Sequence, residues 1–270
     1  MKPSILITGA YGGMGRAAAL ALKERGFRVF ALDKAVGEGE EDILPIEADI
    51  TDEASVSDAF RRVSEQTDEL FAIIHFAGIY MLDSLVEMKS GDFERIFKIN
   101  LGGAFLVNKI FLPLLRDGSR IVMTTSELAP LDPLPFTGIY AVTKSALDKY
   151  AYSLRMELQL KGIKVSVLRA GAVSTGMLGV STDALDRFCE QTELYTCNAE
   201  RFKRIVDSVE ARSIDPSRIA KKVIRILNSR NPRFAYTINR NPLLLMLNVL
   251  PQGMRFWVIK QVLGSRKRDV

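Results

Sequence analysis

The sequence has few of the residues that build metal centres or disulfide networks. Its 270 residues include two cysteines, Cys189 and Cys197, and a single histidine, His75. Two cysteines are too few for a disulfide scaffold, and their spacing from His75 does not match that of metal ligands. We therefore expect no metal site and a reducing, cytoplasmic setting.

Long uninterrupted apolar runs are also missing. The apolar opening, Lys2 to Ile7, gives way at once to a glycine-rich turn, so it is shorter than a signal peptide requires and we expect a strand there. Near the C-terminus, Pro251, Arg255 and Lys260 interrupt the apolar residues. A membrane-spanning helix needs about 20 apolar residues in succession, so we expect no span in this segment.

The net charge of +5 is concentrated in one segment. From Arg230 to Val270 there are eight basic residues and one acidic residue, a balance of +7. The rest of the chain has 29 basic and 31 acidic residues, a balance of −2. Because this main part is nearly neutral and carries no nucleic-acid motif, we expect no nucleic-acid partner.

Short apolar runs alternate with helical patterns along the chain, which predicts βαβ units and a parallel sheet of the α/β class. The expected strands are Ser4–Thr8, Arg28–Asp33, Ile43–Glu47, Leu70–Phe76, Arg120–Thr125, Lys164–Arg169 and Phe234–Ile238. All but the last are apolar without clean alternation, as expected when helices cover both faces of a sheet. The expected helices are Gly15–Arg25, Glu53–Thr67, Phe93–Leu115, Ile139–Lys161 and Pro216–Asn228, the last with Asp215 as its N-cap.

A glycine-rich turn, running from Thr8 to Gly15, lies between the first expected strand and the first expected helix. Glycines at such a turn let the backbone approach a pyrophosphate, whose charge is held at the helix N-terminus. Asp33 closes the second expected strand 18 residues after Gly15, where a carboxylate can bind ribose hydroxyls. Taken alone, the glycine-rich turn and Asp33 also fit an ordinary tight turn and a surface aspartate without a bound nucleotide.

Tyr140 and Lys144 are four residues apart in an expected helix and therefore share one face. A free tyrosine has a pKa of about 10, and a neighbouring ammonium stabilises the phenolate, so we expect Lys144 to lower the pKa of Tyr140. The phenol can then exchange a proton with a substrate oxygen. Such a pair also occurs by chance on amphipathic helices, so the interpretation depends on the motifs around it.

The spacing Thr-Gly-x-x-x-Gly-x-Gly resembles that of the short-chain dehydrogenase/reductase superfamily, and the similarity continues through nearly the whole chain. Asp49-Ile50 resembles the acidic motif near the adenine ring, and Ala77-Gly78 matches the end of the family's Asn-Asn-Ala-Gly. Asn100, Ser126 and the Tyr-x-x-x-Lys motif from Tyr140 to Lys144 follow in the family's order. The resemblance implies a Rossmann-type doubly wound parallel sheet and an NAD(P)-dependent enzyme that interconverts an alcohol and a ketone.

The resemblance also implies roles for individual residues. The catalytic set is Asn100, Ser126, Tyr140 and Lys144, with Ser126 hydrogen-bonded to the substrate oxygen and Asn100 holding a water that links Lys144 to a proton relay. The implied cofactor-binding residues are Gly9, Tyr11, Gly13, Met14, Gly15, Asp33, Asp49, Ile50, Ala77, Gly78, Asn100, Tyr140, Lys144, Val173 and Thr175.

The chain departs from the family pattern at two places. His75 and Phe76 replace the two asparagines, which puts the bracing of the sheet in doubt, and we expect His75 to be a core residue. Ala170 stands where the family has a proline before Gly171, which loosens the turn.

The choice between the two nucleotides depends on Asp33. A carboxylate repels a 2′-phosphate and pairs with two hydroxyls, so NAD is favoured. Lys34 is the contrary feature, because its charge could offset that of a phosphate, and NADP remains the second choice.

We expect one catalytic domain over residues 1–241, with a polar substrate lid of short helical pieces at about 176–213, and a C-terminal extension over 242–270. The expected pocket residues are Ile79, Tyr80, Leu128 to Phe136, Met177 and Leu178. Because most are apolar, we expect a small hydrophobic substrate, such as a steroid, retinoid or lipid.

The extension combines apolar residues, Trp257 and the cations Arg266, Lys267 and Arg268, which suits a helix at a membrane surface. The alternative is that it packs on its own domain or on another subunit. The family also implies a homo-oligomer that uses the two long helices, an interface that the extension could obstruct or replace.

Two other functional classes stay open. The chain could be a nucleotide-binding regulator or scaffold without catalysis, although the proton-relay residues argue against that. The same fold could also carry out a dehydration or an epimerisation.

Overall fold

The computed structural model describes residues 2–210 and 212–264, without the side chains of 177–182, 197 and 207–210. Seven parallel strands form one sheet in the order β3-β2-β1-β4-β5-β6-β7. Their bounds are β1 Ser4–Thr8, β2 Arg28–Asp33, β3 Ile43–Glu47, β4 Leu70–His75, β5 Leu115–Ser126, β6 Lys164–Ala170 and β7 Ala235–Ile238. The order reverses between β1 and β4, so the prediction of a Rossmann-type doubly wound sheet is confirmed, and a ligand is expected outside the carboxyl ends of these strands.

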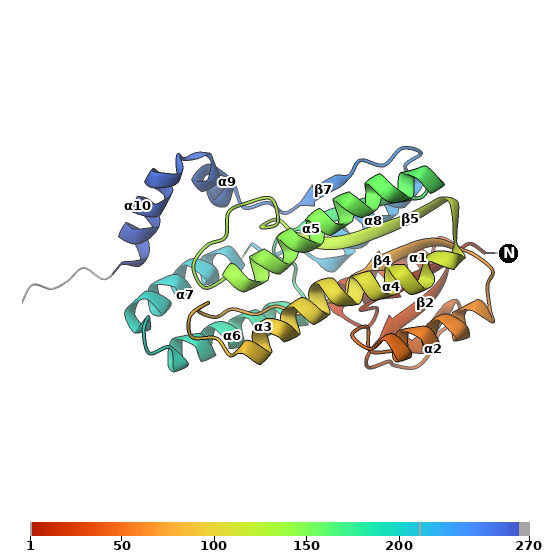
Figure 1. Cartoon of the computed structure of the whole chain (residues 1–270), viewed down its shortest axis with the longest axis horizontal. Coiled ribbons are helices and arrows are strands. Elements are labelled where there is room, and N and C mark those ends of the chain that lie inside the picture. Colours follow the sequence, from red (N-terminus) through yellow and green to blue (C-terminus); the bar gives the residue numbers. More distant parts are fainter. Residues whose placement is uncertain (1, 211, 265–270) are drawn as a thin grey trace, which may run out of the picture.

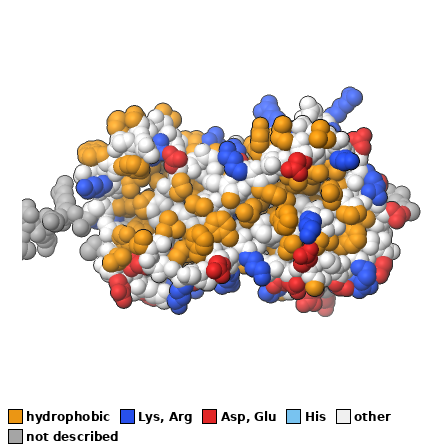
Figure 2. Space-filling view, in the orientation of Figure 1, with side chains coloured by type: hydrophobic (Ala, Val, Ile, Leu, Met, Phe, Trp, Pro, Cys, Tyr) orange, Lys and Arg blue, Asp and Glu red, His pale blue; other side chains and the backbone are white. Residues whose placement is uncertain are grey.

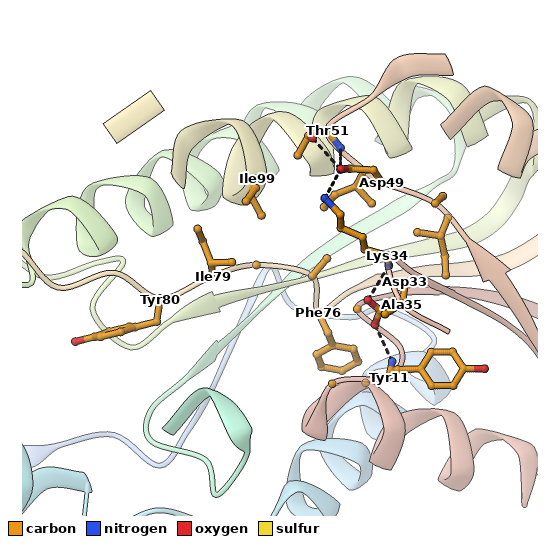
Figure 3. Close-up of a pocket in the computed structure, with 18 of the residues that line it drawn as sticks. Tyr11, Asp33, Lys34, Ala35, Asp49, Thr51, Phe76, Ile79, Tyr80 and Ile99 are labelled. Atoms are coloured by element: carbon orange, nitrogen blue, oxygen red, sulfur yellow. Dashed lines mark hydrogen bonds and ion pairs between the residues drawn. The ribbon is translucent and has the colours of Figure 1, made fainter. Parts of the chain in front are cut away.

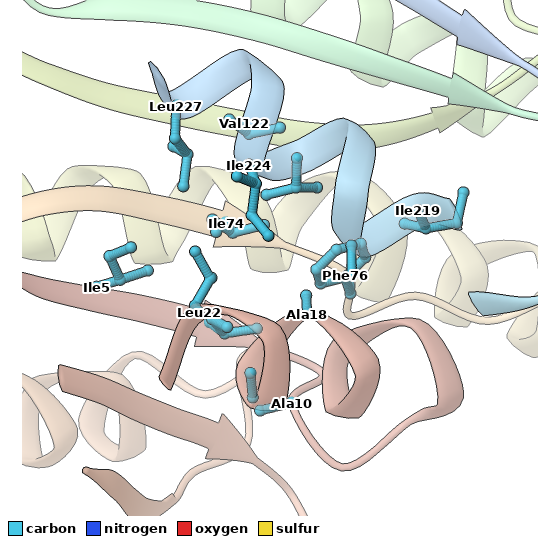
Figure 4. Packing of buried hydrophobic residues seen from close by; sticks show 14 of the residues in the cluster. Ile5, Ala10, Ala18, Leu22, Ile74, Phe76, Val122, Ile219, Ile224 and Leu227 are labelled. Carbon is cyan, nitrogen blue, oxygen red and sulfur yellow. The ribbon is translucent and has the colours of Figure 1, made fainter. Parts of the chain in front are cut away.

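Helices cover both faces of the sheet, which explains why the strands are apolar without alternation. On one face, α1 (Gly13–Lys23) and α8 (Pro216–Asn228) pack together, with Leu22 and Ile224 in one core cluster (Figure 4). On the other face lie α2 (Glu53–Ser64), α4 (Gly103–Phe111) and α5 (Gly138–Leu158). The start of α8 is as predicted, because the Asp215 carboxylate accepts the backbone N–H of Ser217 at 2.8 Å.

The prediction of a single helix at Phe93–Leu115 is wrong. The segment consists of α3 (Ser90–Phe97), a π-helical turn η1 (Lys98–Gly102), α4 and a short 3₁₀ turn η2 (Leu112–Leu114). Pro113 has no N–H to continue an α-helix, so the chain turns there and β5 already begins at Leu115, which pairs with Leu70 of β4. By length and composition the stretch Ser90–Leu114 could span a membrane, yet its inner face packs in the core.

The segment predicted as a lid, for which we keep that name, is more regular than predicted, and its role over the substrate stays a prediction. Instead of short helical pieces, it contains α6 (Gly176–Gln191) and α7 (Thr196–Glu210), of 16 and 15 residues. Phe188 and Phe202 from these two helices pack around Phe136 in a separate apolar cluster with ring centroids 4.7 and 5.4 Å from that of Phe136. This buried apolar face stabilises helices longer than the polar composition suggests.

The C-terminal extension forms two helices, α9 (Pro242–Val249) and α10 (Gln252–Leu263), which lie beside the lid beyond one end of the sheet (Figure 1). Asn241 caps α9 by accepting the N–H of Leu243 at 2.9 Å, and Pro251 separates the two helices. The basic residues 266–268 lie outside the described residues. The domain boundary at residue 241 stays a prediction.

Candidate functional site

The loop between β1 and α1 needs its glycines. Gly9 has a φ of +67°, which favours glycine, and a Cβ at Gly15 would overlap the Gly9 carbonyl oxygen. A Cβ at Gly13 would lie 2.6 Å from Cγ2 of Thr175. No side chain caps the first turn of α1, so its backbone N–H groups suit an anionic ligand.

A cavity of about 990 Å³ opens in front of this loop, at the carboxyl ends of the strands beside the switch point (Figure 3). The predicted cofactor residues that line it are Gly9, Tyr11, Gly13, Met14, Gly15, Asp33, Asp49, Ile50, Ala77, Gly78 and Thr175. In Figure 3, Asp33 and Tyr80 lie at opposite ends of the cavity. The space and the glycine-bounded loop fit an elongated dinucleotide.

Asp33 and Asp49 are held in place at one end of this cavity. Asp33 accepts the backbone N–H of Tyr11 at 2.9 Å and that of Lys34 at 2.8 Å (Figure 3). The Lys34 ammonium pairs with the Asp49 carboxylate at 2.8 Å, and Thr51 donates to the same carboxylate. The hydrogen bond from Lys34, with those from Thr51, lowers the pKa of Asp49 to about 2. Two carboxylates and one paired ammonium leave this end with negative charge.

Ser126, at the end of β5, and Tyr140, in the first turn of α5, line a second cavity of about 220 Å³ next to the first. A side-chain hydrogen bond joins the two residues. The Tyr140 ring lies 4.7 Å, centroid to centroid, from that of Tyr80. Met14, Phe76, Tyr80 and Thr175 line both cavities, so a ligand in one would meet a ligand in the other at this point.

The prediction that Lys144 lowers the pKa of Tyr140 is wrong for the chain by itself. Burial removes water from the phenol and raises the pKa of Tyr140, and Tyr80 adds to this, while the hydrogen bond with Ser126 opposes it. The Lys144 Nζ lies 5.7 Å from the Tyr140 ring centroid, as their shared helix face predicts, and it donates to the Thr124 carbonyl oxygen at 3.3 Å. Burial lowers the pKa of Lys144 to about 8, so its own charged form is disfavoured.

Asn100 lies in the π-helical turn η1, which widens the helix at this point. Its Oδ1 accepts the Ile79 N–H at 2.8 Å, and its Nδ2 donates to the Ile79 carbonyl at 3.0 Å and to Thr143 Oγ1 at 3.2 Å. A Cβ at Gly78 would lie 3.1 Å from Asn100 Oδ1 and 3.3 Å from Lys144 Nζ, so both groups border Gly78. Asn100 thus fixes the loop after β4, and the relay water stays a prediction.

His75 supplies the bracing that the missing asparagines put in doubt. Its Nε2 lies 2.9 Å from Asn108 Oδ1, and its Nδ1 lies 3.4 Å from Thr8 Oγ1. Asn108 in turn donates to the Tyr150 hydroxyl at 3.3 Å. These side-chain contacts join β1, β4, α4 and α5, so His75 is a buried core residue, as the sequence predicts.

The other departure from the family pattern is Ala170, which precedes Gly171. A Cβ at Gly171 would overlap the Asn239 carbonyl oxygen.

The second cavity has a polar end at Ser126 and Tyr140 and is otherwise largely apolar. Among the residues expected there, Tyr80, Leu128 and Leu134 line it, as does Val173, whereas Ile79 lines the first cavity and Phe136 lies in the lid cluster. The side chains of Met177 and Leu178 lie outside the described residues. Lining residues that the sequence analysis missed include Glu127, Phe202, Ile205, Val206 and Leu244. The helical spacing of 202, 205 and 206 could have identified three of them.

Comparisons with known proteins agree with this architecture. A family model described as short chain dehydrogenase matches residues 3–186. Estradiol 17-beta-dehydrogenase 2 of Mus musculus is 28% identical over 287 residues, which cover 96% of this chain and 74% of that protein.

Solved structures share the fold at lower identity. The 3-ketoacyl-(acyl-carrier-protein) reductase of Brucella melitensis, complexed with NADH, has a TM-score of 0.71 at 20% identity, over 87% of this chain and 96% of that one. ElxO with NADP bound has a TM-score of 0.71 at 22% identity, over 88% of this chain and 97% of that one. The family uses NAD(P). The chain belongs to the short-chain dehydrogenase family and is an oxidoreductase that acts on CH–OH groups.

Proposed function

We propose that the protein interconverts a secondary alcohol and a ketone on a hydrophobic substrate, with NAD as hydride acceptor or donor. The observation that carries this proposal is the meeting of the two cavities. Ser126 and Tyr140 line a largely apolar cavity that adjoins the glycine-bounded one, and the Tyr140 ring contacts Tyr80, which lines both. A substrate oxygen placed there would contact both hydroxyl groups.

The glycines of the β1–α1 loop would hold the pyrophosphate, Asp33 the adenosine ribose, and Val173 and Thr175 the carboxamide of the nicotinamide, as in the family. When bound, the nicotinamide supplies or accepts the hydride. Tyr140 donates a proton to the ketone oxygen in reduction and takes it back in oxidation, while Ser126 hydrogen-bonds the same oxygen. Because burial raises its pKa, Tyr140 is protonated at neutral pH, which is the form that reduction requires.

The preference for NAD rests on the negative end of the nucleotide cavity. Asp33 would repel a 2′-phosphate, and Lys34, which could have offset that repulsion, is paired with Asp49. Lys34 is largely exposed, but Asp33, Asp49 and Lys34 together carry one net negative charge whether or not the pair forms, so the local charge stays negative. Repulsion of a doubly charged phosphate therefore outweighs any attraction by Lys34.

The hydrophobic substrate is supported by the cavity lining, in which Leu128, Leu134 and Phe202 surround the polar end. A volume of about 220 Å³ is below the usual range of ligand cavities, roughly 300–1,000 Å³, so it suits the reacting end of a larger apolar molecule. The similarity to a protein named for estradiol agrees with a steroid, retinoid or lipid-like substrate.

A turnover screen tests this proposal. NAD and NADP, each in both redox states, are combined with steroid, retinoid, fatty-acyl and sugar alcohols or ketones, and the absorbance of the reduced nicotinamide is followed. We expect turnover of apolar secondary alcohols or ketones, faster with NAD than with NADP. No turnover of any alcohol or ketone would favour a nucleotide-binding scaffold. Product formed without net change of the nicotinamide would favour a dehydratase or an epimerase.

We also propose that the protein is a homo-oligomer. Apolar side chains gather over α4 and α5 on the face shown in Figure 2, and those that are exposed include Phe105, Val142, Tyr152 and Met156. Exposed apolar patches of this kind commonly become subunit interfaces. Light scattering on a size-exclusion column should give a mass that is a multiple of 30.1 kDa, and a mass of 30.1 kDa would contradict the proposal.

For the outer surface of the extension we propose contact with a membrane surface. Met246, Val249, Phe256 and Trp257 are exposed on α9 and α10, and the segment carries most of the chain's excess of positive charge. Apolar groups with flanking cations favour the interface of an anionic bilayer. Phe256→Ser with Trp257→Ser should reduce co-sedimentation with phosphatidylserine vesicles, and unchanged co-sedimentation would contradict this role.

A further inference from the structure

The C-terminal extension is attached to the segment that follows Ser126. Glu127, the next residue, is only 8% exposed, and its Oε2 accepts the backbone N–H of Asn241 at 2.6 Å. Five residues further on, the Asp132 N–H donates to Asn248 Oδ1 at 3.0 Å. The Asp132 carboxylate forms an ion pair with Arg255, whose side chain is 11% exposed. These contacts tie both α9 and α10 to the β5–α5 segment.

The other end of the extension is attached to the lid. Leu263, at the end of α10, is buried in the cluster that contains Phe136 and Phe202, with Ile259 packed against it. Asn198 at the start of α7 donates from Nδ2 to the Leu263 carbonyl oxygen at 2.5 Å. The extension therefore bridges the two structures that enclose the apolar cavity, the β5–α5 segment and α7.

Between these two attachments, one side chain among the described residues of the extension lines the cavity. Leu244 lines the cavity together with Ser126 and Tyr140, and with Phe202 and Val206 of the lid. Its neighbour Leu243 is 62% exposed and does not line the cavity. A wall residue and a surface residue of the same type thus stand side by side on α9.

We propose that the extension forms one wall of the substrate cavity, that Leu244 limits the size of the apolar group bound next to the reacting carbon, and that Glu127 is a positioning residue that holds Asn241 and so the wall. This inference rests on the proposed function, because it assigns the cavity to the substrate. Specificity then depends on a segment about 100 residues after the catalytic tyrosine, outside the doubly wound sheet.

A substrate series tests the wall. Secondary 2-alkanols from four to twelve carbons are oxidised by the wild type, by Leu244→Ala and Leu244→Trp, and by the matched controls Leu243→Ala and Leu243→Trp, all at saturating nucleotide. Loss of apolar contact is expected to raise the KM of Leu244→Ala for the shortest alcohols about tenfold and to shift its preference to longer ones. Leu244→Trp should lose the longer substrates. Both Leu243 variants should keep the wild-type profile.

Two substitutions, one conservative and one not, test the role of Glu127. Glu127→Gln retains an oxygen that can accept the Asn241 N–H, whereas Glu127→Ala removes it. We expect Glu127→Ala to raise the KM for the alcohol several-fold without changing the KM for the nucleotide, and Glu127→Gln to restore most of the loss. Equal values for the Ala and Gln variants would overturn the role of Glu127.

The wall and the proposed function can fail separately. If the wild type oxidises the alcohols and all four leucine variants share its profile, the wall is refuted while the function stands. If the wild type oxidises none, binding of 1-anilinonaphthalene-8-sulfonate, an amphipathic dye whose aromatic part enters apolar cavities, decides the wall independently. At least tenfold weaker binding by Leu244→Trp than by Leu243→Trp would support it, and equal binding would refute it.

Discussion

The buried His75 makes the stability of the protein depend on pH in a calculable way. Its ring is nearly inaccessible, and burial lowers its pKa to about 4, although the hydrogen bond with Asn108 opposes that shift. An unfolded histidine has a pKa of about 6.5. At pH values between these two pKa values, His75 is protonated in the unfolded chain and neutral in the folded chain. The contribution to stability is therefore complete above pH 6.5 and is lost as the pH falls towards 4.

The size of the change in unfolding free energy follows from the folded and unfolded pKa values of His75. One pKa unit corresponds to about 1.4 kcal/mol, so the full difference is worth on the order of 3 kcal/mol, of which roughly 2.5 is lost between pH 7.5 and 4.5. The assay is urea unfolding, followed by circular dichroism, of the wild type and of His75→Asn at several pH values. The wild type should lose about that much more unfolding free energy than the variant across this interval. If His75→Asn does not fold, His75→Gln serves, and parallel pH profiles would refute the reasoning.

Two further predictions concern the nucleotide cavity. Gly15→Ala would force its Cβ against the Gly9 carbonyl, so we expect loss of nucleotide binding in calorimetry, whereas Gly253→Ala, which meets nothing within 4 Å, should bind normally. Equal nucleotide binding by both variants would contradict the close approach of Gly15 to the Gly9 carbonyl oxygen. Asp33→Ala removes a carboxylate that repels a 2′-phosphate, so the ratio of kcat/KM with NAD to that with NADP should fall at least tenfold. An unchanged ratio would remove Asp33 from the explanation of cofactor choice.

Much of the fold could be predicted because local signals agree with the tertiary structure. The strands β1, β2 and β3 have the predicted ends, since each is a short apolar run bounded by turn residues. Asp215 followed by a proline marked the start of α8 for the same reason. The residues assigned to the cofactor lie mostly around one cavity, because parallel strands bring their carboxyl ends to one edge of the sheet.

Other features could not be predicted because they depend on contacts between distant segments. The π-helical turn around Asn100 has no signature in the 3.6-residue periodicity, so the segment was predicted as one helix. The lid helices depend on burial around Phe136, far from them in the sequence. The elevated pKa of Tyr140 reflects burial, which the spacing of Tyr140 and Lys144 does not reveal.

The measurement that tests the central claim most directly is the turnover of Tyr140→Phe compared with its nucleotide binding. The substitution removes only the hydroxyl group, so the ring contact with Tyr80 and the shape of the cavity are retained. If Tyr140 transfers the proton, alcohol oxidation and ketone reduction should both fall by at least 100-fold, while the affinity for the nucleotide, measured by calorimetry, stays within about twofold. Turnover equal to that of the wild type would contradict the account.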